Sequence, residues 1–181
     1  MEEFADCNLK QDFANYILKE ESLTKKIEII LYLQKKINIF FDNSAIFKAL
    51  IVKLFIECMN IDVDKNKVIT AMLLCCCKKI NNAQDVEKIK AYAKEGANFL
   101  SELGFSKEFC TICEQHNRYS NSTPRLKESD ILELADQFGG MLLDRPERVA
   151  FPIEEALLLL ENRNLKNCNN IYLKYQFIKN D

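Results

Sequence analysis

Residues 45–59, AIFKALIVKLFIECM, are a very apolar stretch that we expect to form the central helix of the fold. Asp42, Asn43 and Ser44 come directly before it and supply both a stop for the preceding helix and a new N-cap. A polar break rich in aspartate follows, and a further helix is predicted over roughly 67–79. The centre of the chain is therefore predicted to be helical.

Apolar side chains recur at steps of three and four residues through most of the remaining chain, as they do on one face of a helix. In the segment 24–40 this pattern leaves the lysines on the outer side. Further helices are predicted over 8–20, 24–40, 85–103, 107–117, 130–143 and 154–163.

Residues at the ends of these segments support the same assignment. Gly104 suits the position just after a helix, and Ser106 suits the N-cap of the next one. Asp130 followed by Glu133 resembles a capping box. The long irregular stretch is 118–129, which is predicted to be a loop.

Composition favours helices as well. Hydrophobic residues make up 48% of the 181 residues, which is enough for a core, while 4 glycines and 3 prolines are few for a turn-rich all-β fold. We predict one all-α domain over 1–181, with N-terminal helices in 1–43, a core over 44–163 and a tail, 164–181, that docks as a short helix or strand.

Charge and hydropathy exclude several classes of protein. A net charge of −2 argues against a nucleic-acid partner, and no apolar run reaches the ~18 residues that span a bilayer. Acidic residues stand where a signal peptide carries basic ones, so the 8 cysteines are expected to be free thiols in a reducing compartment. We predict a cytoplasmic protein without membrane or nucleic-acid partners.

The cysteines leave two interpretations open. Cys110 and Cys113 form a CxxC pair, and the single histidine, His116, follows three residues later. One histidine excludes sites that need several imidazoles, and a structural zinc site needs four ligands. Consecutive residues of a helix point in different directions, so at most one or two of Cys75–Cys77 could converge with the others. The thiols either fill an apolar core or bind zinc.

From residue 71 onward, four segments follow one another in an order and spacing similar to the HD-GYP branch of the HD superfamily. They are AMLLCCCKKI, IKAYAKEGANFLSELGF, ICEQHNRYSNSTPR and ILELADQFGGMLLDRPERVAFPIEEALLLL. The parts LADQF, RPERVA and EEAL carry the resemblance most strongly, over a little under half of the chain. Members of that family are all-helical, metal-dependent phosphohydrolases that typically cleave cyclic di-GMP. The resemblance implies an HD-like helical bundle over 44–163.

The family's metal ligands are mostly replaced in this chain. The resemblance places its His-Asp pair on Cys75 and Cys76, and its next histidine on Tyr92. Of two adjacent family histidines, the first falls on Gln115 and the second is kept as His116. The family's first histidine would lie near Asn43 or Ser44, and its Gly-Tyr-Pro loop is reduced to Ser122-Thr123-Pro124. The residues retained are Lys79, His116, Arg118, Asp136, Arg145, Pro146 and Arg148.

This loss predicts an inactive domain. A two-metal site needs several hard or imidazole ligands, and only His116 and Asp136 remain of about six. Lys79, His116 and Asp136 would then be vestigial. We predict a catalytically inactive HD-GYP-like domain of bacterial-type signalling, without cofactor, that acts as a regulatory or protein-interaction module through a protein partner or self-association.

Two alternatives stay open. One is a phosphohydrolase whose atypical site binds zinc, iron or manganese through Cys75, Cys76, His116 and Asp136. The other is a sensor that binds a cyclic dinucleotide without cleaving it, through Arg118, Arg125, Arg145 and Arg148.

Three structural expectations accompany these hypotheses. His116 should be either a helix C-terminal cap or a core imidazole. Asp136 lies among apolar residues and should reach His116 or a cation, the candidates being Lys79, Arg145 and Arg148. The segments 24–40 and 171–178 carry apolar residues in excess of what the core needs, and they are expected to form a partner surface.

Overall fold

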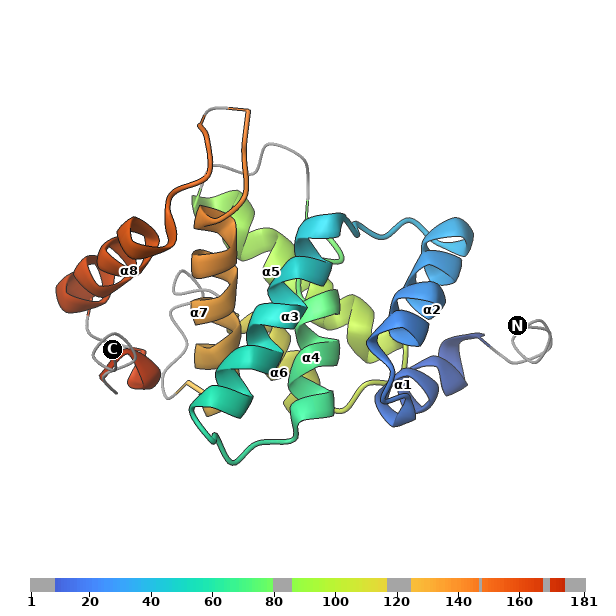
Figure 1. Ribbon diagram of the computed structural model, residues 1–181. Coiled ribbons are helices and arrows are strands. Elements are labelled where there is room, and N and C mark those ends of the chain that lie inside the picture. The colour runs from blue at the N-terminus through green and yellow to red at the C-terminus, as the bar shows by residue number, and fades with distance from the viewer. Residues whose placement is uncertain (1–8, 80–85, 117–124, 147, 168–169, 175–181) are drawn as a thin grey trace.

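The chain is all-helical in the part that the structure describes, as predicted (Figure 1). The computed structural model describes residues 9–79, 86–116, 125–146, 148–167 and 170–174. One isolated β-bridge joins Arg145 to Arg148 within these ranges. The elements are α1 (Leu9–Lys19), α2 (Leu23–Lys36), α3 (Asn43–Cys58), α4 (Lys65–Leu74), α5 (Val86–Glu102), α6 (Lys107–Glu114), α7 (Lys127–Met141), α8 (Ile153–Asn167) and the 3-10 helix η3 (Ile171–Lys174).

Helix α3 is the centre of the fold, as its apolar sequence predicts. The Asp42 carboxylate caps it by accepting hydrogen bonds from the N–H groups of Ser44 and Ala45. The helix packs against both α4 and α7 (Figure 1), and its side chains at Ala49 and Val52 are fully buried. The core is therefore built around α3, α4 and α7.

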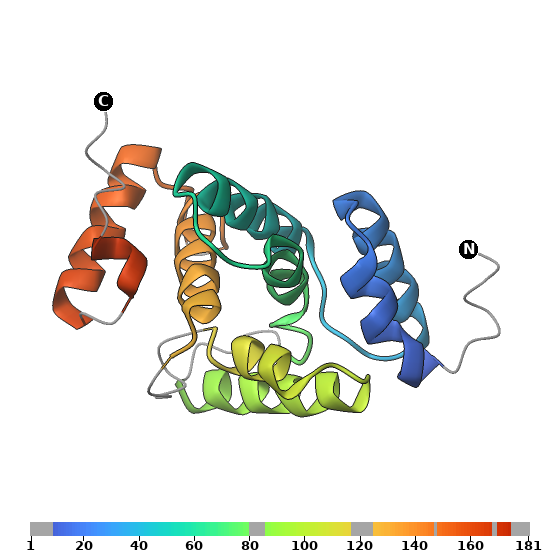
Figure 2. The ribbon, with the colours of Figure 1, turned by 90° about the horizontal axis from the view of Figure 1, so that it is seen from below.

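The other helices surround this centre. Figure 2 shows α5 and α6 on the side of α4 and α7 that is opposite α3, with α1 and α2 at one end of the molecule and α8 at the other. None of the described helices is long and apolar enough to cross a membrane.

Two predicted helix-end residues are confirmed in atomic detail, and a third cap comes from the predicted polar break before α4. Asp64 caps α4 through a hydrogen bond from the N–H of Lys67, and Ser106 caps α6 through one from the N–H of Phe109. Gly104 follows α5 with a positive φ of 85°, a conformation that costs a glycine little. These are local signals, so the sequence alone is sufficient to find them.

Two helices end earlier than their apolar pattern predicts. Helix α2 ends at Lys36 rather than at residue 40, and the following segment runs past the end of α4, where Phe40 N–H donates to the Cys77 carbonyl at 2.7 Å. Helix α4 ends at Leu74 rather than at residue 79. Apolar periodicity continued past both ends because residues such as Ile39 and Cys77 of the connecting segments are also buried.

The predicted capping box at Asp130 is wrong. Helix α7 begins at Lys127, so Asp130 lies within its first turn, and the N-cap position belongs to Leu126. The Asp130 carboxylate pairs instead with Arg125, at 2.9 Å, and accepts a hydrogen bond from the N–H of Ile171. A buried carboxylate is stabilised more by these tertiary partners than by a helix terminus.

Lys26 corrects the expectation that the lysines of 24–40 face outward. Its side chain is buried, and its ammonium donates to the Ile17 carbonyl and to Thr70 Oγ1. These bonds join α2 to α1 and α4. Burial lowers the pKa of Lys26 from 10.5 to about 8, and the charges of Glu20 and Asp64 only partly oppose that effect.

Candidate functional site

The end of α4 brings two consecutive thiols together. Cys75 is the C-cap of α4, and the chain continues in tight turns in which Cys77 N–H donates to the Leu74 carbonyl and Lys79 N–H to the Cys76 carbonyl. The Sγ atoms of Cys75 and Cys76 lie 3.8 Å apart, while Cys77 turns away toward the Gly96 carbonyl of α5. Two of the three consecutive cysteines converge, as the sequence allowed.

His116 joins this pair from the end of α6. Its ring is 1% exposed, and Nδ1 lies 2.7 Å from the Cys113 carbonyl in the last turn of that helix. His116 is therefore a core imidazole that also bonds a helix C-terminal carbonyl, which combines the two roles expected of it. Its other nitrogen, Nε2, lies 3.8 Å from Cys76 Sγ, and the Tyr92 ring packs beside it at 6.0 Å between centroids.

Asp136 of α7 lies beside this group and pairs with Lys48 of α3. The Lys48 ammonium donates to Asp136 Oδ1 at 2.7 Å. The expectation that Asp136 reaches a cation is confirmed, but the cation is Lys48 rather than Lys79, Arg145 or Arg148. Gly139 makes this possible, since a Cβ there would lie 2.8 Å from Lys48 Cγ and 3.0 Å from Ile51 Cδ1. The glycine lets α3 approach α7 closely enough for the ion pair.

The charges of the cluster are strongly coupled. A hydrogen bond from the Cys75 thiol and the neighbouring His116 hold the pKa of Cys76 well below its usual range, although burial opposes this. The same Cys75–Cys76 hydrogen bond, together with burial, raises the pKa of Cys75. Burial alone would lower the pKa of His116, yet the charges of Cys76 and Asp136 raise it. These effects favour charge on Cys76 and His116 and disfavour it on Cys75.

A pocket opens beside Cys76. It is small, with a cavity volume of about 10 Å³, and its polar lining comes from the turn after α4 and from the start of α3. Lys48 and Lys79 both line it, and Lys79 Nζ lies 5.5 Å from the centre of the Phe40 ring. The polar lining residues are Asp42, Ser44, Lys48, Cys76 and Lys79.

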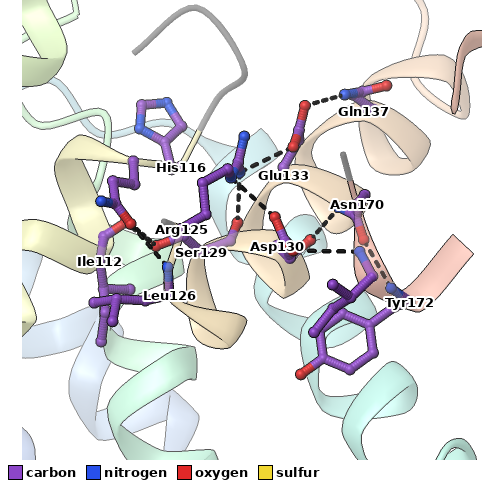
Figure 3. Close-up of polar contacts among 12 residues, drawn as sticks. Ile112, His116, Arg125, Leu126, Ser129, Asp130, Glu133, Gln137, Asn170 and Tyr172 are labelled. Atoms are coloured by element: carbon purple, nitrogen blue, oxygen red, sulfur yellow. Dashed lines mark hydrogen bonds and ion pairs between the residues drawn. The ribbon is translucent and has the colours of Figure 1, made fainter. Parts of the chain in front are cut away.

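Arg125, one of the four arginines of the sensor hypothesis, is engaged within the protein. Figure 3 shows its guanidinium between two carboxylates of α7, with Nε 2.9 Å from Asp130 and a terminal nitrogen 2.9 Å from Glu133. Its side chain is 9% exposed. The same region is tied to the chain end, because the Asn170 amide donates to the Asp130 carbonyl at 2.7 Å.

Two other arginines of that hypothesis, Arg145 and Arg148, contact the end of α7 and the segment that connects it to α8. Arg148 donates to the carbonyls of Gly140, Met141 and Val149 and covers the Phe151 ring at 4.6 Å. The Arg145 guanidinium lies over Gly140, where a Cβ would be 2.6 Å from it. Arg118 lies outside the described residues. These contacts hold the α7–α8 connection and are not directed at Cys76 or His116.

The thiols of the CxxC pair are not among the clustered ligand atoms. Cys110 Sγ donates to the Phe105 carbonyl and Cys113 Sγ to the Ala71 carbonyl, and both residues are buried. Burial raises the pKa of Cys113, and it raises that of Cys77 to about 12. Cys77, Cys110 and Cys113 are therefore neutral thiols that fill the core. The cysteines that the structure describes are all free of disulfides.

Among the described residues, one group offers several metal ligands at short range. It consists of Cys75, Cys76 and His116, whose ligand atoms all lie within 4.8 Å of one another. Asp136 is close enough to influence the charge of this group but is not a member of it.

Lys48 is the member of this site that the sequence did not reveal. No local signal distinguishes it, because Lys53 lies in the same apolar run 45–59 and is exposed. Comparison of the chain with family models, with curated proteins and with solved structures finds no match.

Proposed function

We propose that this chain is a non-catalytic helical domain, a degenerate relative of the HD-GYP branch, which acts as a regulatory or protein-interaction module. The single observation that carries this proposal is the ion pair between Lys48 and Asp136. It places an ammonium group on the carboxylate that a hydrolytic metal centre of the family's kind would need.

The ligand chemistry supports the same conclusion. Manganese and magnesium prefer oxygen ligands, and iron centres of this kind use imidazoles and carboxylates. The cluster offers instead two thiols and one imidazole, and its nearest carboxylate is already neutralised by Lys48 at 2.7 Å. These residues do not fit two hard divalent ions, so no hydrolytic step is derived from them.

The proposed relationship draws support from the placement of corresponding residues. The resemblance matches five residues of this chain to metal-site positions of the family. They come from the end of α4, from α5, from the end of α6 and from α7, and are Cys75, Cys76, Tyr92, His116 and Asp136. They lie in one neighbourhood, with Cys76 and Tyr92 both against His116 and with Asp136 acting on its charge. A chance alignment would not be expected to bring these positions together.

Exposed apolar side chains support a role in protein contacts. Leu50 and Leu54, four residues apart on one face of α3, are 44% and 56% exposed. The described residues of the segments 24–40 and 171–178 are mixed, because Ile30, Leu33 and Tyr172 are buried whereas Leu31 and Ile171 are each 43% exposed, and residues 175–178 lie outside the described residues. Other large apolar residues exposed in the described chain are Tyr16, Val149, Ile153 and Leu158.

Catalytic inactivity is tested by phosphodiesterase assays. The full chain is incubated with manganese, magnesium or iron(II) and with cyclic dinucleotides or simple phosphodiesters. We expect no turnover above a protein-free blank. Metal-dependent turnover that disappears in Asp136→Ala, while the variant keeps its helical circular dichroism, would show that the domain is an enzyme.

The interaction role is tested by light scattering over a concentration series and by pull-down from cell extract. Leu54→Asp places a charge on the exposed face of α3, and Lys53→Gln is the matched control at a neighbouring exposed position. Self-association or capture of a partner should be lost in the first variant and kept in the second. A strict monomer without an enriched partner contradicts the proposed role.

A further inference from the structure

We propose that Cys75, Cys76 and His116 form a mononuclear site for a zinc-class divalent ion. This inference goes beyond the proposed function. That function requires the two-metal hydrolytic centre to be absent, whereas the site proposed here holds one ion through sulfur and nitrogen ligands. It is carried by the separation of the ligand atoms, by the orientation of the imidazole and by the charge balance around them.

Two of the three ligand separations match a tetrahedral ion. With Zn–S bonds of about 2.3 Å and Zn–N bonds of about 2.0 Å, tetrahedral geometry places two sulfurs about 3.8 Å apart and a sulfur and a nitrogen about 3.5 Å apart. The Cys75 and Cys76 Sγ atoms lie 3.8 Å apart, and Cys76 Sγ lies 3.8 Å from His116 Nε2. All three ligand atoms lie within 4.8 Å of one another, so the Cys75–His116 pair would have to close by at most about 1.3 Å around an ion.

The imidazole is already oriented for coordination. A carbonyl oxygen only accepts hydrogen bonds, so at the 2.7 Å contact with Cys113 it is Nδ1 of His116 that carries the hydrogen. This leaves Nε2, the nitrogen that faces Cys76, to bind the metal. In zinc-bound histidines, the ring nitrogen that does not bind the metal usually donates a hydrogen bond to a carbonyl or carboxylate, which orients the ring.

One divalent ion would compensate the two thiolates of the group. The Asp136 carboxylate already pairs with Lys48, and Lys79 adds one further positive charge nearby. Among the described residues, no fourth His, Cys, Asp or Glu joins the three ligands, so water would complete the tetrahedron. Two sulfurs and one imidazole favour zinc over manganese or magnesium.

The site would link the end of α4 to the end of α6. Both segments are buried in the core, and the ligands come from positions 40 residues apart in the sequence. A bound ion would therefore stabilise the packing of these two helices, as structural zinc does in other proteins.

The test uses the full-length chain, reduced and freed of metal, titrated with Co²⁺ and then with Zn²⁺. We expect one Co²⁺ per chain, with a thiolate charge-transfer band for two sulfurs and the intense visible bands of a tetrahedral ion, all removed by one equivalent of Zn²⁺. Cys76→Ser and His116→Gln should each weaken binding by more than about 100-fold, since outer-shell partners alone contribute about 10–100-fold.

Two cysteine variants serve as matched controls. Cys77→Ala removes the third thiol of the same run, which faces Gly96, and Cys58→Ser changes an exposed thiol of α3. Both should keep the wild-type spectrum and affinity. The site is refuted if the wild type shows no band for two thiolates, or if the band persists in Cys76→Ser. If circular dichroism shows that the ligand variants do not fold, the site is judged from the intensity of the wild-type thiolate band and from the two control variants.

Discussion

Replacing Lys48 by methionine removes an ammonium group while keeping most of the aliphatic stem that packs between α3 and α7. The ammonium is 2.7 Å from Asp136, and the two side chains are 9% and 32% exposed. Breaking a fully buried ion pair costs about 3–5 kcal/mol, but water still reaches a third of the Asp136 side chain. We therefore expect Lys48→Met to lower the free energy of unfolding by about 2 kcal/mol.

The reverse variant leaves the other charge unpaired. Asp136→Asn strands the Lys48 ammonium, which is the more buried partner, so we expect a loss of about 3 kcal/mol. The double variant strands neither charge. It should lose about 3 kcal/mol rather than the sum of both, which corresponds to a coupling energy of about 2 kcal/mol.

Urea unfolding of the four proteins, followed by circular dichroism, measures this coupling directly. Lys53→Met, at an exposed position of the same helix, is the control and should show no coupling to Asp136→Asn. A coupling energy below about 0.5 kcal/mol for Lys48 would refute the ion pair as a stabilising contact. It would also remove the observation on which the proposed inactivity rests.

Three further predictions concern stability measured by urea unfolding. Gly139→Ala should lower the free energy of unfolding by about 1–3 kcal/mol because its Cβ would lie 2.8 Å from Lys48 Cγ. The control Gly96→Ala, whose Cβ has only ordinary contacts, should be neutral or stabilising. Equal effects of the two variants would contradict the close approach of α3 and α7. The pKa of Lys26 is about 8 in the folded state against 10.5 when unfolded, so between these pH values the unfolded chain binds more protons. The stability of the wild type relative to Lys26→Met should therefore rise by about 3 kcal/mol over this pH range. Parallel pH profiles of the two proteins would mean that Lys26 is not buried as a charge. Arg125→Met removes the cation that lies between two buried carboxylates and should cost about 3–5 kcal/mol. A loss below about 1 kcal/mol would place the guanidinium in solvent.

Local signals in the sequence were sufficient for the secondary structure. Apolar residues at helical spacing predicted each of the eight α-helices in the described residues, and capping residues such as Asp42 and Ser106 placed several helix starts correctly. These features depend on residues within one or two turns of each other, so they can be interpreted without the fold. The predicted N-cap at Asp130 was wrong because its buried carboxylate pairs with Arg125 and with the N–H of Ile171 instead.

The candidate site was only partly predictable. Cys75, Cys76, His116 and Asp136 could be named together from the sequence, but their mutual distances could not. Lys48, which is 88 residues from Asp136, was not identified at all.

The sequence by itself determined the helices, several of their caps and the supply of thiols, because these follow from neighbouring residues and from composition. Only the tertiary structure decided which charges and ligands meet. The Asp136 partner depends on a close approach of α3 and α7 at Gly139, and the Cys76–His116 contact depends on how the ends of α4 and α6 pack. Burial and charge pairing are properties of packed elements that are distant in the sequence, so no local pattern encodes them.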